Sequence, residues 1–322
     1  MSHAILSSRV LNVENCGEAC QWLIEDLPMP PLLSASIVPT VAGLIAKEGI
    51  KGILIDETDR QTGKRRLAGL GLSIFVVDPL MDHYRSEPVP FALIDALARN
   101  TSKAGNILLR NEIAAANANG GLNLIVHYMQ RGWDLSHPHW RAVGAIGHQT
   151  YIEHHVGYFL KRIYQEDWAT NEEIYLMAGY TPLHQYRVAK ASMPPTSPPL
   201  GDSRIAFFAE RNEVCARAPG STMSYVFERH LPHCQFSAAE QRILSLALED
   251  LTDLEIAQRI GLSPTRIKQT WRSIYQKIAD ELPFLVSEED FGDDQRRGRE
   301  KRRRVLSYVS EHREEIRPFK GA

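Results

Sequence analysis

The chain has 322 residues, of which 43% are hydrophobic and 24% charged, and its formal net charge is -2. That length and apolar content allow a sizeable core and predict more than one domain. The near-neutral balance excludes a broadly basic coat for nucleic acid, so any affinity for DNA would have to come from a local patch.

Residues 1–232 are predicted to form one α+β domain with a mixed sheet, a class indicated by alternating helical and strand patterns. The helical patterns are carried by Val41, Leu44 and Ile45, by Phe91, Ile94 and Leu97, and by the stretch after Pro138. The strand patterns lie at 52–56, 67–77, 122–129 and 204–210. A proline-rich run at 193–200 is the best candidate for a linker or surface loop.

A glycine pattern in this domain could hold a cofactor. Arg66, Gly69 and Gly71 match the loose R-x-x-G-x-G motif of acyl-CoA-dependent acetyltransferases, in which a glycine-rich turn and a helix N-terminus hold a pyrophosphate. The following residues continue a β pattern, so glycines spaced by two also fit a strand that needs small residues on one face. We favour the strand, expect no cofactor and leave cofactor-binding residues unassigned.

Histidines are concentrated in the second half of the same domain, at His127, His137, His139, His148, His154 and His155. His154 and His155 would point about 100° apart on a helix, so no three-ligand face emerges and satisfied core or surface histidines are favoured over a metal or acid–base site. If the domain takes a small-molecule ligand, the aromatic segment from Trp133 to Tyr158 is the expected place. No nucleophile elbow, P-loop or H-E-x-x-H motif occurs, so no catalytic residue is predicted.

Cysteine usage and hydropathy bear on the compartment. Cys16, Cys20, Cys215 and Cys234 show no paired metal-ligand spacing, so we expect no metal site and a reduced environment. The sequence also shows neither a secretory leader nor an apolar run of about 20 residues. These features predict a soluble, cytoplasmic protein with no membrane partner.

The segment 252–278 has the local signals of two helices joined by a tight turn. Thr252 and Glu255 form a capping-box pattern, Gly261 ends the first helix, and Ser263 followed by Pro264 begins the second. A preceding helix at 236–251, capped by Ser237, would complete a three-helix core. The second helix has an apolar stripe opposite a polar, cationic face, and the stripe consists of Ile267, Trp271, Ile274 and Ile278.

Residues 236–278 resemble the LuxR/FixJ-type helix-turn-helix domain of bacterial transcription regulators. The shared residues are Ser237, Glu240, Ile243, Leu244, Glu255, Ile256, Ala257, Gly261, Leu262, Ser263, Ile267, Lys268, Ile274, Tyr275 and Lys277. The resemblance implies an all-α helix-turn-helix domain at 233–282, in which Lys268, Gln269 and Arg272 approach bases or phosphates. Arg266, Gln269 and Thr270 depart from the threonine, valine and histidine often found there, and Asp250 replaces a frequent glycine.

The polar face of the second helix supplies the predicted DNA-binding residues: Thr265, Arg266, Lys268, Gln269, Arg272, Ser273, Gln276 and Lys277. In the major groove, arginine or lysine can bind guanine and glutamine can bind adenine, each good pair discriminating by about 1–3 kcal/mol. The alternative is an ordinary helical hairpin whose charges are solvated, and Lys277 fits a surface lysine equally well.

Residues 283–322 are predicted to be a charged extension that contains one helix, with Val305, Val309 and Ile316 on one side. An acidic block at 280–294 precedes a basic run at 295–304. Neutralisation of one block by the other is favoured, and additional phosphate contacts are the alternative.

The sequence therefore predicts a bacterial, cytoplasmic transcription regulator that is not an enzyme. Its N-terminal domain would sense an unknown signal, with a small-molecule ligand as one option. Its C-terminal domain would read double-stranded DNA as a homodimer. The competing hypothesis is an acyltransferase-like enzyme domain tethered to a DNA-binding domain, and a third is a ligand-independent interaction module.

Overall fold

The computed structural model describes residues 4–102, 105–132, 137–187, 203–285 and 294–320. The chain divides into two compact units, with residues 1–155 and 159–228 in unit 1 and residues 156–158 and 229–322 in unit 2. The proline-rich run at 193–200 and the aromatic Trp133 lie outside the described residues.

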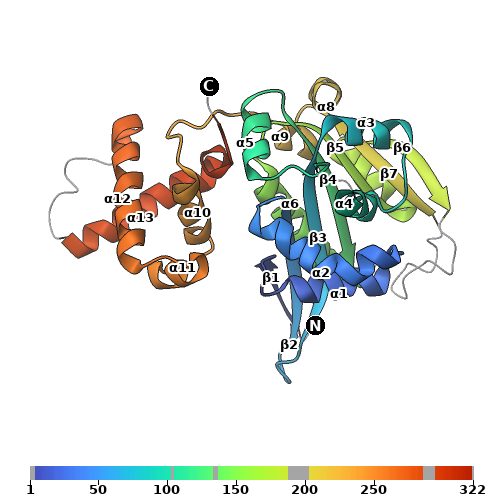
Figure 1. The fold of residues 1–322 in the computed structure, drawn as a ribbon, viewed down its shortest axis with the longest axis horizontal. Helices are drawn as coiled ribbons and strands as arrows, with labels where there is room; N and C mark the ends of the chain where they lie inside the picture. The colour runs from blue at the N-terminus through green and yellow to red at the C-terminus, as the bar shows by residue number, and fades with distance from the viewer. Residues whose placement is uncertain (1–3, 103–104, 133–136, 188–202, 286–293, 321–322) are drawn as a thin grey trace. The chain divides into compact units, whose positions relative to one another are not determined.

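Unit 1 is built on a seven-stranded mixed sheet with the order β1-β2-β3-β4-β5-β7-β6 (Figure 1). Neighbouring strands are antiparallel except β4 and β5, which run parallel. The strands are β1 (Ala4–Val10), β2 (Ile50–Asp59), β3 (Arg65–Val76), β4 (Leu122–Gln130), β5 (Leu160–Trp168), β6 (Thr181–Arg187) and β7 (Ser203–Glu210). The expected combination of helices with a mixed sheet is confirmed.

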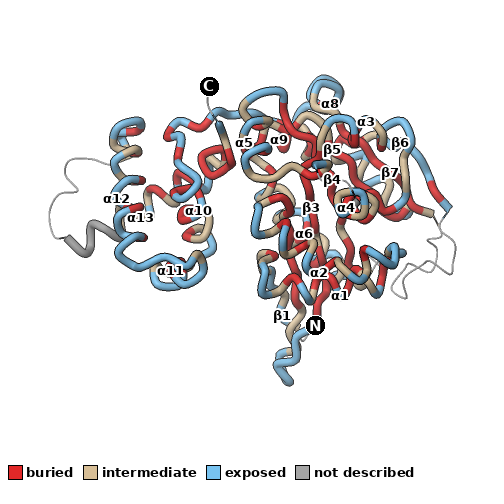
Figure 2. Tube along the Cα trace, viewed as in Figure 1, coloured by how far each residue is buried: buried red, intermediate tan, exposed pale blue. Residues whose placement is uncertain are grey.

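The four strands predicted from sequence are β2, β3, β4 and β7, and β7 finds its partners in β5 and β6. The tube coloured by burial shows β3, β4 and β5 as largely buried segments (Figure 2). Strands buried on both faces read as continuous apolar runs, which explains why β3 and β4 were visible in the sequence. β5 (Leu160–Trp168) was missed because it contains Lys161, Arg162 and three further polar residues.

Helices cover both faces of this sheet. The larger core packs α1 (Cys16–Asp26), α2 (Pro31–Ala46), α3 (Asp78–Ser86) and α4 (Ala92–Ser102) against one face, where Leu54, Leu70 and Ile125 are buried. The opposite face packs Ile53 and Ile55 against Val143 of α6 (Pro138–His155). The alternation of Ile53, Leu54 and Ile55 between the two cores is the period of two expected for a strand.

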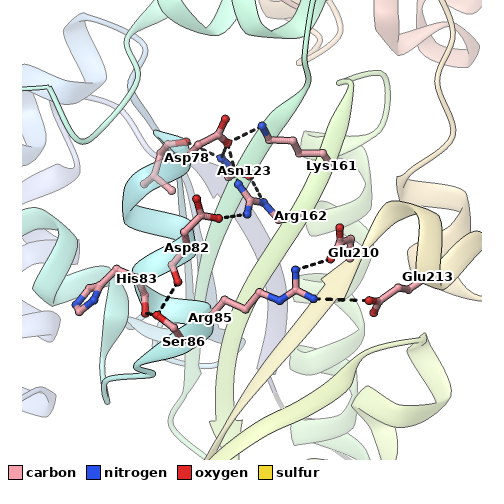
Figure 3. A network of polar contacts seen from close by, with 11 residues as sticks. Asp78, Asp82, His83, Arg85, Ser86, Asn123, Lys161, Arg162, Glu210 and Glu213 are labelled. Carbon is pink, nitrogen blue, oxygen red and sulfur yellow. Dashed lines mark hydrogen bonds and ion pairs between the residues drawn. The ribbon is translucent and has the colours of Figure 1, made fainter.

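Ion pairs tie α3 to the sheet beside it (Figure 3). Asp78 accepts hydrogen bonds from Asn123 of β4 at 2.7 Å and from Arg162 of β5 at 2.8 Å. Arg162 also pairs with Asp82, one turn further along α3. At the other end of α3, Arg85 lies 2.8 Å from the carboxylate of Glu210, the last residue of β7. These contacts hold α3 across β4, β5 and β7, and β4 and β5 also form part of the floor of the cavity described below.

The remaining helices of unit 1 are short connections around the sheet. They are α5 (Arg110–Ala118), α7 (Glu172–Ala178), α8 (Arg211–Arg217) and α9 (Thr222–Val226), and a 3-10 turn, η1 (Ala169–Asn171), precedes α7.

Unit 2 is all-helical in its described part. Its elements are α10 (Ala238–Ala247), α11 (Asp253–Ile260), α12 (Pro264–Glu281), η3 (Pro283–Leu285), α13 (Asp294–Glu311) and η5 (Arg313–Ile316). The four residues predicted as the apolar stripe of α12 are buried in a single core with residues of α10 and α11. Val305, Val309 and Ile316 join the same core, so the C-terminal segment packs with the helices that precede it.

The helix ends in unit 2 follow the predicted capping chemistry. Ser237 with Glu240 and Thr252 with Glu255 form capping boxes, and Ser263 caps α12. Gly261 closes α11 with φ of 67°. Asp250 has φ of 60°, a left-handed conformation that aspartate tolerates better than most residues, which explains how it replaces a glycine before α11.

None of the helices in the described residues is long and apolar enough to cross a membrane.

Candidate active site

A cavity of about 590 Å³ lies within unit 1 on the face of the sheet that carries α6. Its floor is formed by β2, β3, β4 and β5, and its walls by α6, α7 and the start of α9. The lining includes Tyr128, Tyr151, Tyr175 and Tyr180, and Asp167 is its only carboxylate among the residues that the structure describes. A volume of this size is in the range of small-molecule sites.

Small residues face one another across the cavity, so side chains do not fill this space. Gly71 and Ser73 of β3 form part of the floor, and Gly144 and Gly147 of α6 form part of the roof. At Gly147 a Cβ atom would come 2.5 Å from Cε2 of Tyr128, so the helix approaches this ring as closely as a glycine allows. At Gly144 the nearest atom would be 3.5 Å away, which leaves ordinary space.

The parallel strands β4 and β5 separate beside this cavity. Their register runs from Leu122 opposite Leu160 to His127 opposite Glu166, and no later pair is formed, although both strands continue. Tyr128 and Gln130 on the continuing part of β4 line the cavity, as does Asp167 on β5. The facing edges of the two strands therefore present backbone groups that do not pair with each other, next to an apolar space.

Asp167 is the centre of a buried polar network on the cavity wall. Its carboxylate accepts hydrogen bonds from the Tyr175 hydroxyl at 2.9 Å, from the Asn171 amide at 3.2 Å and from the backbone of Trp168 at 2.7 Å. Gln165 donates to the Tyr175 hydroxyl at 2.9 Å. Burial raises the pKa of Asp167 despite these hydrogen bonds, and burial together with the charge of Asp167 raises the pKa of Tyr175 well above 10.

Part of the histidine cluster lies in this site. His148, His154 and His155 line the cavity, and the Nε2 atom of His155 lies 2.8 Å from Oγ of Ser73. His127 points to the opposite face of the sheet, where it is buried and its Nε2 has no hydrogen-bond partner among the described residues. His139 lies 3.4 Å from Glu57. Within the described residues no group of three or more potential ligands could hold a metal ion.

The aromatic segment expected to line a ligand pocket does so through Tyr151. Tyr175 of α7 and Tyr180, which directly precedes β6, also line the cavity. Both were missed because the sequence around them shows no motif.

The R-x-x-G-x-G residues are part of a strand rather than of a cofactor-binding turn. Arg66 pairs with Glu57 across the β2–β3 ladder, and Gly69 and Gly71 lie opposite Ile55 and Ile53. A Cβ atom at Gly69 would come 3.0 Å from the Ile55 side chain. The interpretation of these glycines as small residues on one strand face is therefore confirmed.

The eight residues predicted to bind DNA lie on α12, and all are exposed except Lys277, which is half-buried. Two of them contact a carboxylate of α10. Ser273 donates to Glu240 at 2.6 Å, and the ammonium of Lys277 contacts the same carboxylate at 2.9 Å. In the basic run, Arg302 contacts Asp253 at 2.7 Å. A DNA-contacting role for these residues stays a prediction.

No protein family profile and no curated protein matches the chain. Among solved structures, the N-acyl amino acid synthase FeeM from uncultured soil microbes covers 68% of this chain and 98% of its own, with 11% identity and a TM-score of 0.35. A mutant form of the spermidine/spermine N-acetyltransferase SpeG from Vibrio cholerae covers 66% and 98%, with 10% identity and a TM-score of 0.33. The aminoglycoside acetyltransferase AAC(6')-Ib with coenzyme A and kanamycin covers 66% and 99%, with 11% identity and a TM-score of 0.29.

These matches correct the sequence-based prediction of a regulator that is not an enzyme and whose main partner is double-stranded DNA. The three matched structures are those of an N-acyl amino acid synthase and of two acetyltransferases. The prediction was drawn from residues 236–278, which hold the only long sequence motif but lie outside unit 1. A helix-turn-helix pattern indicates how short helices are capped and packed, and this packing by itself does not specify a function.

Proposed function

We propose that unit 1 is an acyltransferase domain that moves an acyl group from a thioester such as acyl-coenzyme A to the amine of a small molecule. The observation that carries this proposal is the separation of β4 and β5 after His127 and Glu166, directly beside the apolar cavity. Open strand edges bind extended chains through backbone hydrogen bonds, and the pantetheine arm of coenzyme A is such a chain with amide groups. The apolar lining would accept the acyl group.

Asp167 is the residue that we propose to receive the amine. It is the only acid that the described part of the chain contributes to the cavity lining, so it attracts an ammonium group, and its raised pKa makes it a stronger base than an ordinary aspartate. Tyr175 and Asn171 hold the carboxylate in place through their hydrogen bonds. A basic carboxylate at this position would remove the proton that the amine must lose before it attacks the acyl carbon.

The experiment is a binding and turnover assay on the full chain. Octanoyl-coenzyme A and acetyl-coenzyme A are expected to raise the melting temperature, because a ligand at 100 times its dissociation constant stabilises the folded state by about 2.7 kcal/mol. Release of the free thiol in the presence of a panel of amines reports transfer. Thioesters that neither stabilise the protein nor release thiol with any amine would refute the proposal.

A matched pair of α6 variants locates binding. Gly144→Leu extends a side chain into the cavity from a position where a Cβ atom meets no closer contact than 3.5 Å, so it should abolish the thermal shift. Ala142→Leu adds the same side chain on the exposed surface of α6 and should leave the shift unchanged. Equal shifts in the two variants would place binding elsewhere.

For unit 2 we propose a helix-turn-helix fold of the kind that the sequence resembles. The left-handed Gly261 between α11 and α12, the Ser263 cap and the shared core support this proposal. An experimental structure in which α11 and α12 form one continuous helix would contradict it.

A further inference from the structure

Ser73 and His155 form a hydrogen-bonded pair on the wall of the cavity. Ser73 lies on β3 and His155 is the last residue of α6, yet the serine Oγ and the histidine Nε2 are 2.8 Å apart. Both residues belong to the cavity lining, and both are at least 95% buried. The pair is thus shielded from bulk water and adjacent to the space proposed to hold the acyl group.

The second nitrogen of His155 fixes the direction of this hydrogen bond. Its Nδ1 lies 2.7 Å from the backbone carbonyl oxygen of Tyr151, one turn earlier in α6. A carbonyl oxygen only accepts, so Nδ1 must carry the proton, and the neutral ring then has Nε2 as an acceptor for the Ser73 hydroxyl. This arrangement of a nucleophile, a base and a group that orients the base is the one used in nucleophilic catalysis.

The neighbouring strand adds a positive charge. Lys51 of β2 lies directly opposite Ser73 in the antiparallel register, and it also lines the cavity. Residues directly opposite in such a pair have Cβ atoms about 4.5–5.5 Å apart on the same face of the sheet. A cation beside the serine would stabilise the negative oxygen that develops when the hydroxyl attacks a carbonyl carbon.

We propose that Ser73 is a nucleophile that carries the acyl group as an ester, with His155 as its general base. In the first half-reaction the Ser73 proton passes to Nε2 of His155, the Oγ–C bond forms and the C–S bond of the thioester breaks. The proton on His155 then passes to the leaving thiolate. In the second half-reaction the amine nitrogen attacks the ester carbon, its proton passes to His155, and the C–O bond breaks as that proton returns to Ser73.

The identity of the acyl donor in this inference rests on the proposed function, whereas the nucleophilicity of Ser73 does not. A Ser–His hydrogen bond that only satisfies two buried groups is the competing explanation, and it predicts no covalent adduct. The test therefore uses two acyl donors, p-nitrophenyl octanoate, which needs no coenzyme recognition, and octanoyl-coenzyme A.

The full chain is mixed with the ester, and the release of p-nitrophenolate is followed together with the intact mass after acid quenching. We expect a burst of one p-nitrophenolate per chain and one octanoyl group on the peptide that contains Ser73. Ser73→Ala should abolish both, and His155→Asn should slow the burst about 100-fold or more, within the range for loss of general base catalysis. Ser36→Ala and His184→Gln, at positions outside the cavity lining, are the matched controls.

Ser73→Cys keeps the size of the side chain and guards against loss of folding in the alanine variant. It should move the adduct to a thioester at the same position, which hydroxylamine cleaves rapidly. If the hydrogen bond has a purely structural role, the wild type carries no octanoyl ester on Ser73, whatever the reactivity of the cysteine variant.

The outcomes separate this inference from the proposed function. Thiol release from octanoyl-coenzyme A that persists in Ser73→Ala, with no adduct in the wild type, would overturn the role of Ser73 while acyl transfer stands. A Ser73 adduct from the ester alone, with coenzyme A thioesters inert, would support the nucleophile and remove the thioester donor. An adduct mapped to another residue would overturn the inference.

Discussion

The buried histidine on the far side of the sheet makes a quantitative prediction about acid stability. His127 is 3% exposed, its Nε2 has no hydrogen-bond partner among the described residues, and Arg204 acts on it as a neighbouring positive charge. Burial, and then the charge of Arg204, lowers the pKa of His127 from 6.5 to about 3. The folded protein therefore holds this ring neutral at pH values where the unfolded chain protonates it.

Proton linkage gives the direction in which stability changes with pH. The unfolded state binds more protons below pH 6.5, so the stability that is present above this pH is lost progressively as the pH falls toward 3. Between about pH 7.5 and about pH 5, these two pKa values give a loss of about 2 kcal/mol in the free energy of unfolding. His127→Met replaces the ring with an apolar side chain that does not titrate, so this part of the loss should disappear.

The assay is urea unfolding at the two pH values, followed by tryptophan fluorescence. Four of the five tryptophans, Trp22, Trp133, Trp140 and Trp168, belong to unit 1, so the signal reports mainly on its unfolding. For each protein, the quantity compared is the change in the free energy of unfolding between the two pH values. This comparison removes any effect of the substitution that does not depend on pH. His184→Gln, on an exposed position of β6, should lose as much as the wild type. The reasoning fails if His127→Met loses as much stability on acidification as the wild type does.

Three further predictions concern the cavity and its support. Gly147→Ala should lower the free energy of unfolding by about 1–3 kcal/mol in urea titrations, because its Cβ would lie 2.5 Å from the Tyr128 ring. Asp78→Asn should weaken the acid dependence of the melting temperature below about pH 4. Burial raises the pKa of Asp78, but hydrogen bonds from Lys161 and Asn123 outweigh this effect and lower the pKa to about 2. The wild type therefore loses the stability that ionised Asp78 contributes as the pH falls from 3.8 toward 2. The effect should be small, since Asp78 is 54% exposed. Tyr175→Phe removes a hydrogen bond to Asp167 and should reduce the turnover number for amine acylation by about 10-fold, with little change in thioester binding; equal turnover would argue against a positioning role.

Local chemistry explains what could be predicted from the sequence. The capping boxes at Ser237 and Thr252 involve residues three positions apart, and the apolar stripe of α12 repeats within one helix. Both signals are complete within a few turns of chain, so they are readable without the fold. The apolar runs of β3 and β4 are equally local, and they too were found at nearly their observed positions.

The site depends instead on contacts between residues that are distant in sequence. Ser73 and His155 are 82 residues apart, and neither is part of a recognisable motif. Gly71 and Ser73 of β3 face Gly144 and Gly147 of α6 across the cavity, and only the packing of the helix on the sheet brings these small residues together. The separation of β4 and β5 is also absent from the sequence pattern, because β5 contains too many polar residues to be recognised as a central strand.

Glu240 shows why a polar helix face is weak evidence for a partner. The face of α12 was assigned to DNA because packing did not require its polar residues, yet the buried carboxylate of Glu240 binds Ser273 and Lys277 from that face. The hydrogen bonds from Ser273 and Lys277 help to lower the pKa of Glu240 against the effect of burial, so these two residues also stabilise a charge that the capping box places there. In unit 1, by contrast, Ser73 of β3 and His155 at the end of α6 have no distinctive sequence context, yet they meet beside a cavity. The chemistry that a chain can perform depends on which side chains the fold brings together, and in this chain the longest sequence motif lies in unit 2 whereas the Ser73–His155 pair lies in unit 1.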